Sequence, residues 1–245
     1  MSFFDKIERV KGDTFLLTES GGILGYITVL AAAGNSNKIN ITRLVFRQDC
    51  NDDAKQLVKY VIAKYGAKGA SSFHVLVDEA YPELLDLFLS GCGFRQCSSE
   101  SVWKNDRFEQ QKLPFRKFRR SDAKQVCELY NSSIIRYFRP SLDKTEKEFC
   151  DGWVLEDNKK IVAHTSGMDF SALDYIPYDG LLGCVVKLKK YTNNAEQLEN
   201  YLRENRFECI QTHFVLVKDF YKPVKQKENI LQVFHLGESG LLRGQ

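Results

Sequence analysis

The first hundred residues of the chain alternate between short apolar runs and polar turns. Residues 14–19 and 23–31 are two such runs on either side of Gly21-Gly22. Adjacent glycines suit the positive φ angles of a tight turn, so the pattern predicts a β-hairpin. After a further polar turn, Ile39 to Phe46 alternates between apolar and polar residues, which predicts a third strand that is buried unevenly.

Helix and strand patterns alternate over the rest of the first half. Apolar residues recur at three- and four-residue steps from Ala54 to Tyr65, and Asn51-Asp52-Asp53 places acidic side chains where they suit the dipole of a helix. Residues 72–77 are nearly continuously apolar, which is typical of a strand covered on both faces. A helix over residues 82–94, ending in a Gly-Cys-Gly-Phe turn, then precedes a predicted strand over residues 95–104.

A second series of elements follows a polar linker at residues 105–113. We predict a strand over 115–119, a helix capped by Ser121-Asp122, a hairpin over 152–168, a strand over 183–188, a helix over 193–204 and the last strands over 207–218.

The two halves contain copies of one hairpin. Residues 14–28 align without a gap on residues 152–166, an offset of 138, and an aromatic residue (Phe15, Trp153) begins each copy. A repeat at this distance is too long for a solenoid and indicates two related domains in tandem.

The repeat continues at the end of each half, but at a shorter offset. A helix followed by Phe94 matches a helix followed by Phe207, an offset of 113, so the second half has about 25 fewer residues in between. By position, the second half lacks the strand over 39–46 and the helix over 52–65, and we expect residues 169–182 to replace them as a loop.

Composition excludes several classes of protein. The 35 basic and 32 acidic residues give a net charge of +3 without a basic block, which gives little support to nucleic-acid binding. The charged N-terminus does not resemble a signal peptide, and no run of about 18 apolar residues predicts a membrane span. The seven cysteines and four histidines lack the close spacing of zinc ligands, so we expect buried thiols in a reducing cytoplasm and no metal.

The order of these segments resembles the GNAT superfamily of acyl-CoA-dependent N-acyltransferases in its tandem form. Residues 116–123 are similar to the first strand and capped helix of that family, and the two hairpins to its second and third strands. Residues 84–94 and 198–207 are similar to its late helix. The resemblance covers most of the chain and rests on the order of the segments, since none of them is diagnostic alone.

The resemblance implies where a cofactor, acetyl-CoA or another acyl-CoA, would bind. In the family a strand edge holds the pantetheine arm by backbone hydrogen bonds, and a glycine-containing loop with a helix N-terminus holds the pyrophosphate. Transferred to this chain, these positions are Leu44, Val45 and Phe46 on the strand, and Asn51, Asp52, Asp53, Ala54 and Lys55 at the helix.

The phosphate-binding pattern of the family is largely absent here. Of the six loop positions, only Ala54 conforms; Asp49 replaces a basic or amide residue and Asp52 replaces the first glycine. A carboxylate about 4 Å from a phosphate charge costs about 4 kcal/mol at an effective dielectric constant of 20, before screening. Ordinary acidic capping of a helix is the competing interpretation of Asp52 and Asp53.

The catalytic position of the family also differs in this sequence. Many members place a general-acid tyrosine five residues before the late phenylalanine, where this chain has Leu89 and Leu202. Neither leucine can protonate a thiolate. Tyr201 is one position away, about 100° around the helix, and we interpret it as a surface or core residue.

Several other polar residues have both a functional and a structural interpretation. Tyr26 and His164 share one position of the repeat and either line a site as a base or are ordinary half-buried strand residues. His74 alternates with Phe73 and is expected to be a core histidine.

The same two interpretations apply to residues at the ends of elements. Asp78 and Glu79 either accept a proton at the end of a strand or lie in a solvated loop. Cys92 lies in a turn with a packing role, and no Cys-His arrangement supports a nucleophile. The basic residues within 116–120 either attract the 3′-phosphate of CoA or an acidic partner, or form a solvated face.

We therefore predict an α/β protein of two GNAT-like lobes, residues 1–104 and 114–236, each a mixed, mostly antiparallel sheet flanked by helices. The leading hypothesis is an N-acyltransferase, with its cofactor site in the first lobe, in which an unidentified small-molecule or protein amine attacks the thioester directly. The alternative is a non-catalytic binding or scaffold protein derived from the same fold. We expect a cytoplasmic monomer or homodimer without nucleic-acid or membrane partners.

Overall fold

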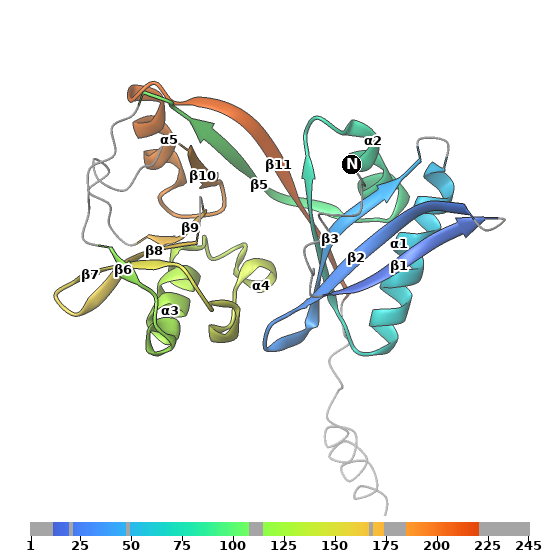
Figure 1. Ribbon diagram of the computed structural model, residues 1–245, viewed down its shortest axis with the longest axis horizontal. Coiled ribbons are helices and arrows are strands. Elements are labelled where there is room, and N and C mark those ends of the chain that lie inside the picture. Colours follow the sequence, from blue (N-terminus) through green and yellow to red (C-terminus); the bar gives the residue numbers. More distant parts are fainter. Residues whose placement is uncertain are drawn as a thin grey trace, which may run out of the picture.

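Two β-sheets and the helices that cover them form the molecule (Figure 1). The structure is a computed structural model, and it describes residues 12–19, 22–47, 50–107, 115–166, 169–173 and 185–220. Seven strands form one sheet, in the order β1-β2-β3-β4-β11-β5-β10, and four form the other, in the order β6-β7-β8-β9.

The elements of the first half agree with the sequence pattern. Helix α1 follows three antiparallel strands, and the late helix continues from α-helical into π-helical geometry. The elements are β1 (Asp13–Glu19), β2 (Gly22–Ala32), β3 (Asn35–Phe46), α1 (Asn51–Ala67), β4 (Ser72–Asp78), α2 (Pro82–Asp86), η1 (Leu87–Gly91) and β5 (Arg95–Lys104).

The second half repeats this series with additions at its start. The predicted strand over 115–119 is only two residues long, and the segment before the hairpin contains two short helical turns. The elements are β6 (Arg116–Lys117), η2 (Arg120–Asp122), α3 (Ala123–Ser133), α4 (Arg139–Leu142), η3 (Glu146–Glu148), β7 (Trp153–Asp157), β8 (Lys160–Ser166), β9 (Asp169–Leu173), β10 (Val185–Lys189), α5 (Ala195–Glu204) and β11 (Glu208–Asp219).

The two hairpins have the same strand register. Phe15 pairs with Ile27 in the first, and Trp153 pairs with Thr165 in the second, so both strands keep the offset of 138. The irregularity after Leu17 in β1 recurs after Leu155 in β7, also 138 residues later. The repeat predicted from the sequence is therefore confirmed down to a shared β-bulge.

The sequence prediction of a loop over residues 169–182 is wrong for its first part. Residues 169–173 form β9, which pairs with β8 as β3 pairs with β2. The pairing satisfies the backbone groups at the outer edge of β8, which an open loop would leave exposed. The strand of the missing unit is therefore present in short form, and residues 174–184 lie outside the described residues.

Each lobe receives a strand from the other. β11, at the end of the second half, lies between β4 and β5 of the first half, while β5 lies between β11 and β10 of the second. Figure 1 shows β5 and β11 running side by side from one lobe to the other. Residues 207–218 were predicted to carry more than one strand; residues 208–218 belong to the single strand β11, because its partners β4 and β5 are supplied by the other half.

A helix covers each of the two sheets. Helix α1 packs its buried side, including Ala54, Val58 and Val61, against β2, β3 and β4 in one continuous core. Helix α3 packs against β8 and β9 of the second sheet. No described helix is long and apolar enough to cross a bilayer.

Candidate functional site

Strands β3 and β4 part at a bulge. They pair in parallel from Lys38 with Ser72 to Ile41 with Val75, and in the described part of the chain the pairing ends there. On the other side of β3, Arg43 pairs with Thr28 and Ile41 with Val29, so Thr42 is the extra residue of a β-bulge. The bulge redirects the end of β3 away from β4 and leaves a strand edge unpaired.

The three strand residues assigned to the cofactor lie beyond this bulge. Leu44 and Phe46 face the core under α1, whereas Val45 is half exposed on the opposite face. Their backbone groups on the β4 side belong to the unpaired edge, which is the kind of edge that holds a pantetheine arm by strand-like hydrogen bonds. The strand part of the predicted site therefore fits an acyl-CoA.

The helix part of the predicted site fits less well. Cys50 is the N-cap of α1 and makes no side-chain capping bond, and Asn51, Asp52 and Asp53 are all exposed in the first turn. Two carboxylates therefore stand where a pyrophosphate would approach the backbone N–H groups, and like charges repel.

The other two assigned residues of α1 point toward the protein. Ala54 is fully buried beneath the helix. The aliphatic stem of Lys55 lies 3.4 Å from the position of a β-carbon built on Gly91, so it packs against the end of η1.

The late helices offer no general acid at the expected position. Pro82–Gly91 and Ala195–Glu204 are related by the offset of 113 along their whole lengths. Leu89 packs against the first core and Leu202 is fully buried in the second lobe, while Tyr201 packs beside the same cluster. These tyrosine and leucine residues have structural roles.

A cavity of about 420 Å³ opens at the point where β3 and β4 part. Ile41 and Val75, the last paired residues, and Thr42 and Leu76, the next ones, all line it. The second lobe also contributes to its lining, through helix α3, the segment over residues 141–144 and, within the large sheet, β10. The cavity lies on the face of the large sheet that faces away from α1, and its volume is in the range of small-molecule sites.

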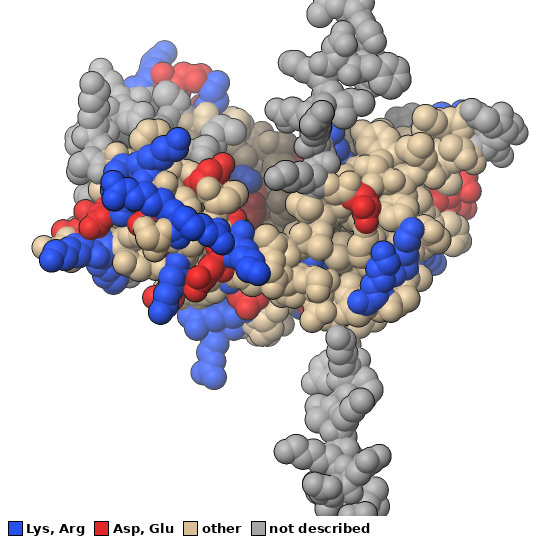
Figure 2. Space-filling view, turned by 60° about the horizontal axis from the view of Figure 1, so that its bottom comes forward, with Lys and Arg blue, Asp and Glu red and all other residues tan. Residues whose placement is uncertain are grey.

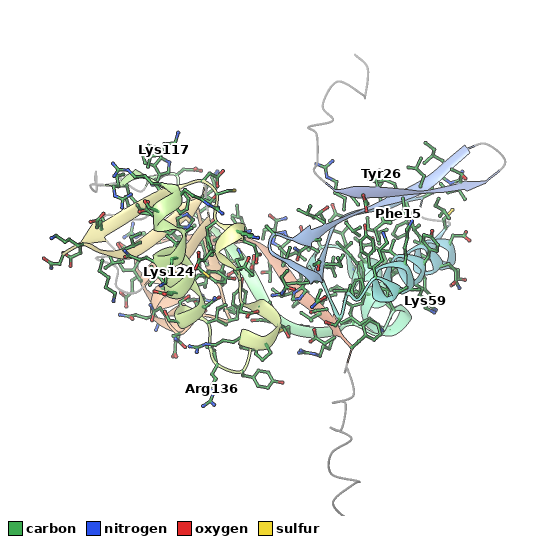
Figure 3. All side chains as sticks on the ribbon, turned by 90° about the horizontal axis from the view of Figure 1, so that it is seen from below. Phe15, Tyr26, Lys59, Lys117, Lys124 and Arg136 are labelled. Carbon is green, nitrogen blue, oxygen red and sulfur yellow. The ribbon has the colours of Figure 1, made fainter. Side chains whose placement is uncertain are left out.

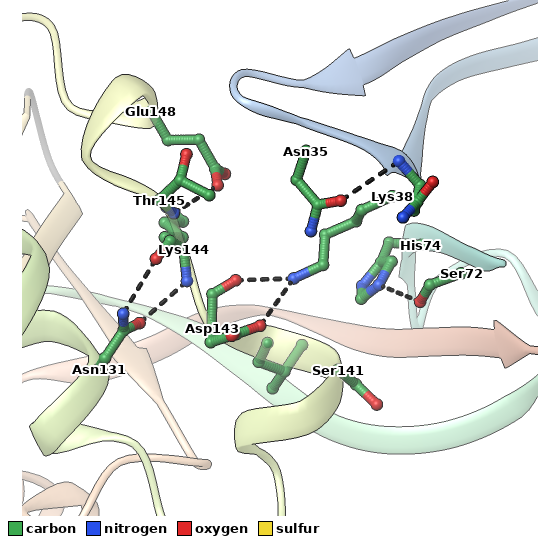
Figure 4. Close-up of polar contacts among 12 residues, drawn as sticks. Asn35, Lys38, Ser72, His74, Asn131, Ser141, Asp143, Lys144, Thr145 and Glu148 are labelled. Atoms are coloured by element: carbon green, nitrogen blue, oxygen red, sulfur yellow. Dashed lines mark hydrogen bonds and ion pairs between the residues drawn. The ribbon is translucent and has the colours of Figure 1, made fainter. Parts of the chain in front are cut away.

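Charged contacts between the lobes form one side of the cavity. The Lys38 ammonium donates to the Asp143 backbone oxygen at 2.6 Å and lies 3.3 Å from its carboxylate (Figure 4). Nearby, Thr145 donates to the backbone oxygen of Ala33 at 2.5 Å. These contacts tie the β2–β3 turn of the first lobe to the loop that follows α4.

A second polar group lies on the large sheet. The Tyr191 hydroxyl donates to one carboxylate oxygen of Glu100 at 2.6 Å, and the Lys187 ammonium lies 3.5 Å from the other. The Glu100 side chain is 8% exposed, so both of its oxygens have partners in a largely buried setting.

Tyr130 is the centre of a third group. The Lys144 ammonium lies 4.8 Å from the centroid of its ring and the Lys189 ammonium 5.4 Å from it. Both distances suit cation–π contacts. The Tyr130 hydroxyl donates to the Leu142 backbone oxygen at 3.3 Å, which fixes the ring at the cavity wall.

His74 is the core histidine that the sequence pattern indicated, and it also lines the cavity. Its Nε2 lies 2.8 Å from the Ser72 hydroxyl. Burial, and after it the positive charge of Lys38, lowers the pKa of His74 to about 4, so the ring is neutral near pH 7.

His164 and Tyr26, which share one position of the repeat, lie in different surroundings. His164 is buried between the rings of Phe118 and Phe149 and lies 3.0 Å from the Asp151 backbone oxygen. Tyr26 lies on the face of the hairpin away from α1, whereas Phe15 contacts the rings of α1 (Figure 3).

The turn cysteine does not suit a nucleophile, and one residue of the basic cluster, Arg116, is held in ion pairs. Burial raises the pKa of the Cys92 thiol, which disfavours a thiolate nucleophile. Arg116 pairs with Asp122 and Glu156, each at 2.7 Å, and thereby raises its own pKa and lowers that of Asp122. Lys117 and Lys124 of the second lobe are exposed (Figure 3). Basic side chains gather on one face of the second lobe, while the same face of the first lobe is mostly uncharged (Figure 2).

Sequence reasoning missed most of the residues that line the cavity. Lys187 and Lys189 alternate with buried Val186 and Leu188 in the strand, so they share one face of β10. Two lysines at a spacing of two in an otherwise apolar strand were the available signal for a charged internal face. Among the described residues no group of three or more potential metal ligands occurs, and the expected lack of a metal site remains a prediction.

Taken together, two lobes that exchange one strand each define the architecture, and solved structures align with the chain over most of its length. The GCN5-related N-acetyltransferase from Sphaerobacter thermophilus aligns with a TM-score of 0.50 at 12% identity, over 87% of this chain and 82% of that one. A tandem GNAT protein from the clavulanic acid biosynthesis pathway aligns with a TM-score of 0.50 at 9% identity, over 86% and 84%. The chain therefore has the tandem GNAT fold.

Other comparisons are partial or negative. The IAA acetyltransferase from Bacillus cereus ATCC 14579 aligns at 20% identity with a TM-score of 0.34, and the chain spans 59% of its length. No protein-family model matches the sequence, and a search of curated proteins finds no match.

Proposed function

We propose that the first lobe binds an acyl-CoA, with acetyl-CoA as the simplest donor, and that its acyl group is transferred to an amine held in the interlobe cavity. The observation that carries the proposal is the position of the cavity, which opens where β3 and β4 part. A pantetheine arm bound along β3 from Phe46 toward Thr42 would run from the N-terminus of α1 to this opening.

Each part of the chain has a role in this proposal. The unpaired edge of β3 positions the donor, which supplies a thioester-activated acyl group. Backbone N–H groups of the parted strands stabilise negative charge on the acyl oxygen, and the cavity holds the amine beside it. Because Leu89 and Leu202 stand at the usual acid positions, the reaction relies on positioning.

A non-catalytic binding or scaffold role is the second candidate. It is favoured by Asp52 and Asp53 at the start of α1 and by the leucines in place of a general acid. Binding of acyl-CoA without turnover is the outcome that would select it.

Isothermal titration with acetyl-CoA and longer acyl-CoAs tests the donor site, and a thiol-release assay with a panel of small amines and amine-containing peptides tests transfer. We expect binding in the micromolar to millimolar range and acceptor-dependent release of CoA. No binding at millimolar acyl-CoA would contradict the proposed function. Size-exclusion chromatography of the same sample decides between a monomer and a homodimer, and the cytoplasmic setting stays a prediction.

A further inference from the structure

Strand β1 forms one edge of the large sheet, at the rim of the first lobe (Figure 1). In the described part of the chain β1 pairs only with β2, so its other side offers backbone groups to a further strand. Natural edge strands usually carry charges or a proline that prevent pairing with another chain. The edge strand at the other end of this sheet, β10, carries Lys187 and Lys189. Residues 14–18 of β1, in contrast, are Thr-Phe-Leu-Leu-Thr, without a charge or a proline.

The internal repeat shows that this edge accepts a strand. At the offset of 138, Leu16 of β1 corresponds to Val154 of β7. In the second lobe Val154 pairs with Arg116 of β6 in the antiparallel sense. Val154 is fully buried there, whereas Leu16 is 56% exposed. Within the described residues, the second lobe therefore has a strand at the place where the first lobe has an open edge.

The sequence of β1 suits pairing with a second copy of itself. Residues 14–18 have the same chemical order in both directions, with threonine at each end and apolar residues between. An antiparallel pair of two copies centred on Leu16 places Thr14 opposite Thr18. It also places Phe15 opposite Leu17, and such Thr–Thr and apolar pairs stabilise a sheet. The register shift beside Leu17 has its extra residue in β2, so β1 itself stays regular.

A groove beside this edge extends the surface that a second copy would contact. It has a volume of about 540 Å³ and lies between β1 and α1. Its lining includes Phe15, Leu57 and the ring of Tyr60, which is 54% exposed. Burial of apolar surface is the main favourable term in most protein association, so the groove adds to what strand pairing alone supplies.

The charges of α1 also suit a second copy in the antiparallel orientation. Tyr65, near the end of α1, donates a hydrogen bond to Asp13 at the start of β1. Asp53, in the first turn of α1, lines the groove together with Leu17, so α1 and β1 run in opposite directions. Lys64 lies in the last turn of α1. A two-fold axis at the centre of β1 reverses the second copy, and the acidic end of one α1 then lies on the same side as the basic end of the other.

From these observations we infer that the chain forms a homodimer in which β1 pairs with β1 of a second copy, antiparallel and centred on Leu16. The same patch is used on both subunits, so a two-fold axis closes the assembly as a dimer. The two large sheets become one continuous sheet, with both α1 helices on one face. The inference goes beyond the proposed function and does not depend on acyl-CoA binding.

Sedimentation equilibrium of the full-length chain without ligand tests the inference. We expect a mass twice that of a single chain. Leu16→Lys places two like charges opposite each other at the axis, and it should raise the dissociation constant of the dimer by about tenfold or more. Ile210→Lys is the matched control, since Ile210 is 54% exposed on β11, and it should leave the constant unchanged.

Circular dichroism verifies that both variants fold. A monomeric full-length chain, or a folded Leu16→Lys variant that dimerises as tightly as the control, would overturn the inference. If the full-length chain is monomeric and deletion of residues 1–11 makes it dimeric, that segment occupies the edge and the homodimer assignment fails.

Charge exchange tests the antiparallel orientation. Asp53→Lys and Lys64→Glu each place like charges at facing ends of the two copies, so each should weaken the dimer, and less so at high salt. The double variant restores opposite charges and should recover most of the lost affinity. Single variants that dimerise like the unchanged chain, or a double variant weaker than either single one, would contradict the orientation.

Discussion

Glu100 and His213 lie directly opposite each other on β5 and β11, and the internal repeat maps each residue onto the other. They are 113 residues apart, the offset already seen between Phe94 and Phe207. The same offset relates the two ends of this strand pairing: the Lys104–Glu208 pair corresponds to the Arg95–Val217 pair. The two register shifts between β5 and β11 correspond to each other in the same way. A pseudo-two-fold axis therefore passes through the Glu100–His213 pair.

This symmetry predicts that neither half folds alone. Without β11, the first half would expose one edge of β4 and one of β5, together with the core surface that buried Leu216 covers. We expect fragments 1–107 and 108–245 to lack cooperative thermal unfolding separately and to regain it when mixed, measured by calorimetry and near-ultraviolet circular dichroism.

A cleaved full-length chain is the control for that experiment. A protease site inserted within residues 108–114 should give a nicked protein that stays assembled on size exclusion, because the exchanged strands are unaffected. A cooperative transition of fragment 1–107 on its own would show that the strand exchange is not required for folding of the first lobe.

The hairpins were predictable from the sequence, whereas the strand exchange was not. The correspondence of Phe15 and Trp153 aligned the two hairpins in the sequence, and the strand registers confirm that alignment. The apolar pattern of β11, in contrast, is the same whether its neighbours come from its own lobe or the other, since a pattern records burial and not the partner. The β9 strand was missed because five residues give too short a pattern.

The cavity was not predictable for a related reason. Lys38, Asp143 and Lys189 are far apart in the sequence, and only the exchange of β5 and β11 brings their strands and loops together. The sequence assigned the donor residues by family resemblance, and their role as a site stays a prediction. Leu89 and Leu202, at the positions where the family resemblance places a general acid, pack into the cores, and the lack of an acid there stays a prediction.

Gly25→Ala is predicted to destabilise the first lobe. A β-carbon on Gly25 would lie 2.6 Å from the Val45 backbone oxygen and 2.8 Å from the Phe46 β-carbon. Strand β3 would have to shift at the edge assigned to the donor, so we expect a loss of about 1–3 kcal/mol in the free energy of unfolding and weaker acyl-CoA binding. Urea denaturation and titration measure the two effects.

Gly66→Ala is the matched control for Gly25→Ala. Gly66 lies in α1, and a β-carbon there has nothing within 4 Å. We expect this variant to be neutral or to gain up to about 1 kcal/mol from the higher helix propensity of alanine. Equal stability of the two variants would mean that β2 and β3 are not as close as the structure places them.

His74 is predicted to make stability depend on pH. Its pKa is about 4 when folded, against the ordinary histidine value of 6.5 in the unfolded chain, so the unfolded chain binds more protons between these pH values. The stabilisation is present above pH 6.5 and is lost as the pH falls toward 4. Between pH 7.5 and 5.0 we expect a loss of about 2 kcal/mol from this group.

Comparison with His74→Gln isolates this contribution, since glutamine keeps a polar partner for Ser72 and does not titrate. The decrease in unfolding free energy between pH 7.5 and 5.0, measured by urea denaturation, should be smaller in the variant. An identical decrease in both proteins would assign the pH dependence to other groups.

Asp52 is predicted to weaken the binding of acyl-CoA by charge and by shape. Asp52→Asn removes only the charge, and Asp52→Gly also removes the β-carbon that separates phosphate from the helix backbone. We expect about threefold tighter acetyl-CoA binding for asparagine and about tenfold for glycine, the latter equal to about 1.4 kcal/mol.

Asp157→Asn, an exposed change of the same charge on β7 of the second lobe, is the control for net charge. The gain should shrink between 50 and 300 mM salt, since exposed charges are screened. If neither Asp52 variant differs from the control, the phosphates do not bind at the N-terminus of α1, and the donor site must be placed elsewhere in the lobe.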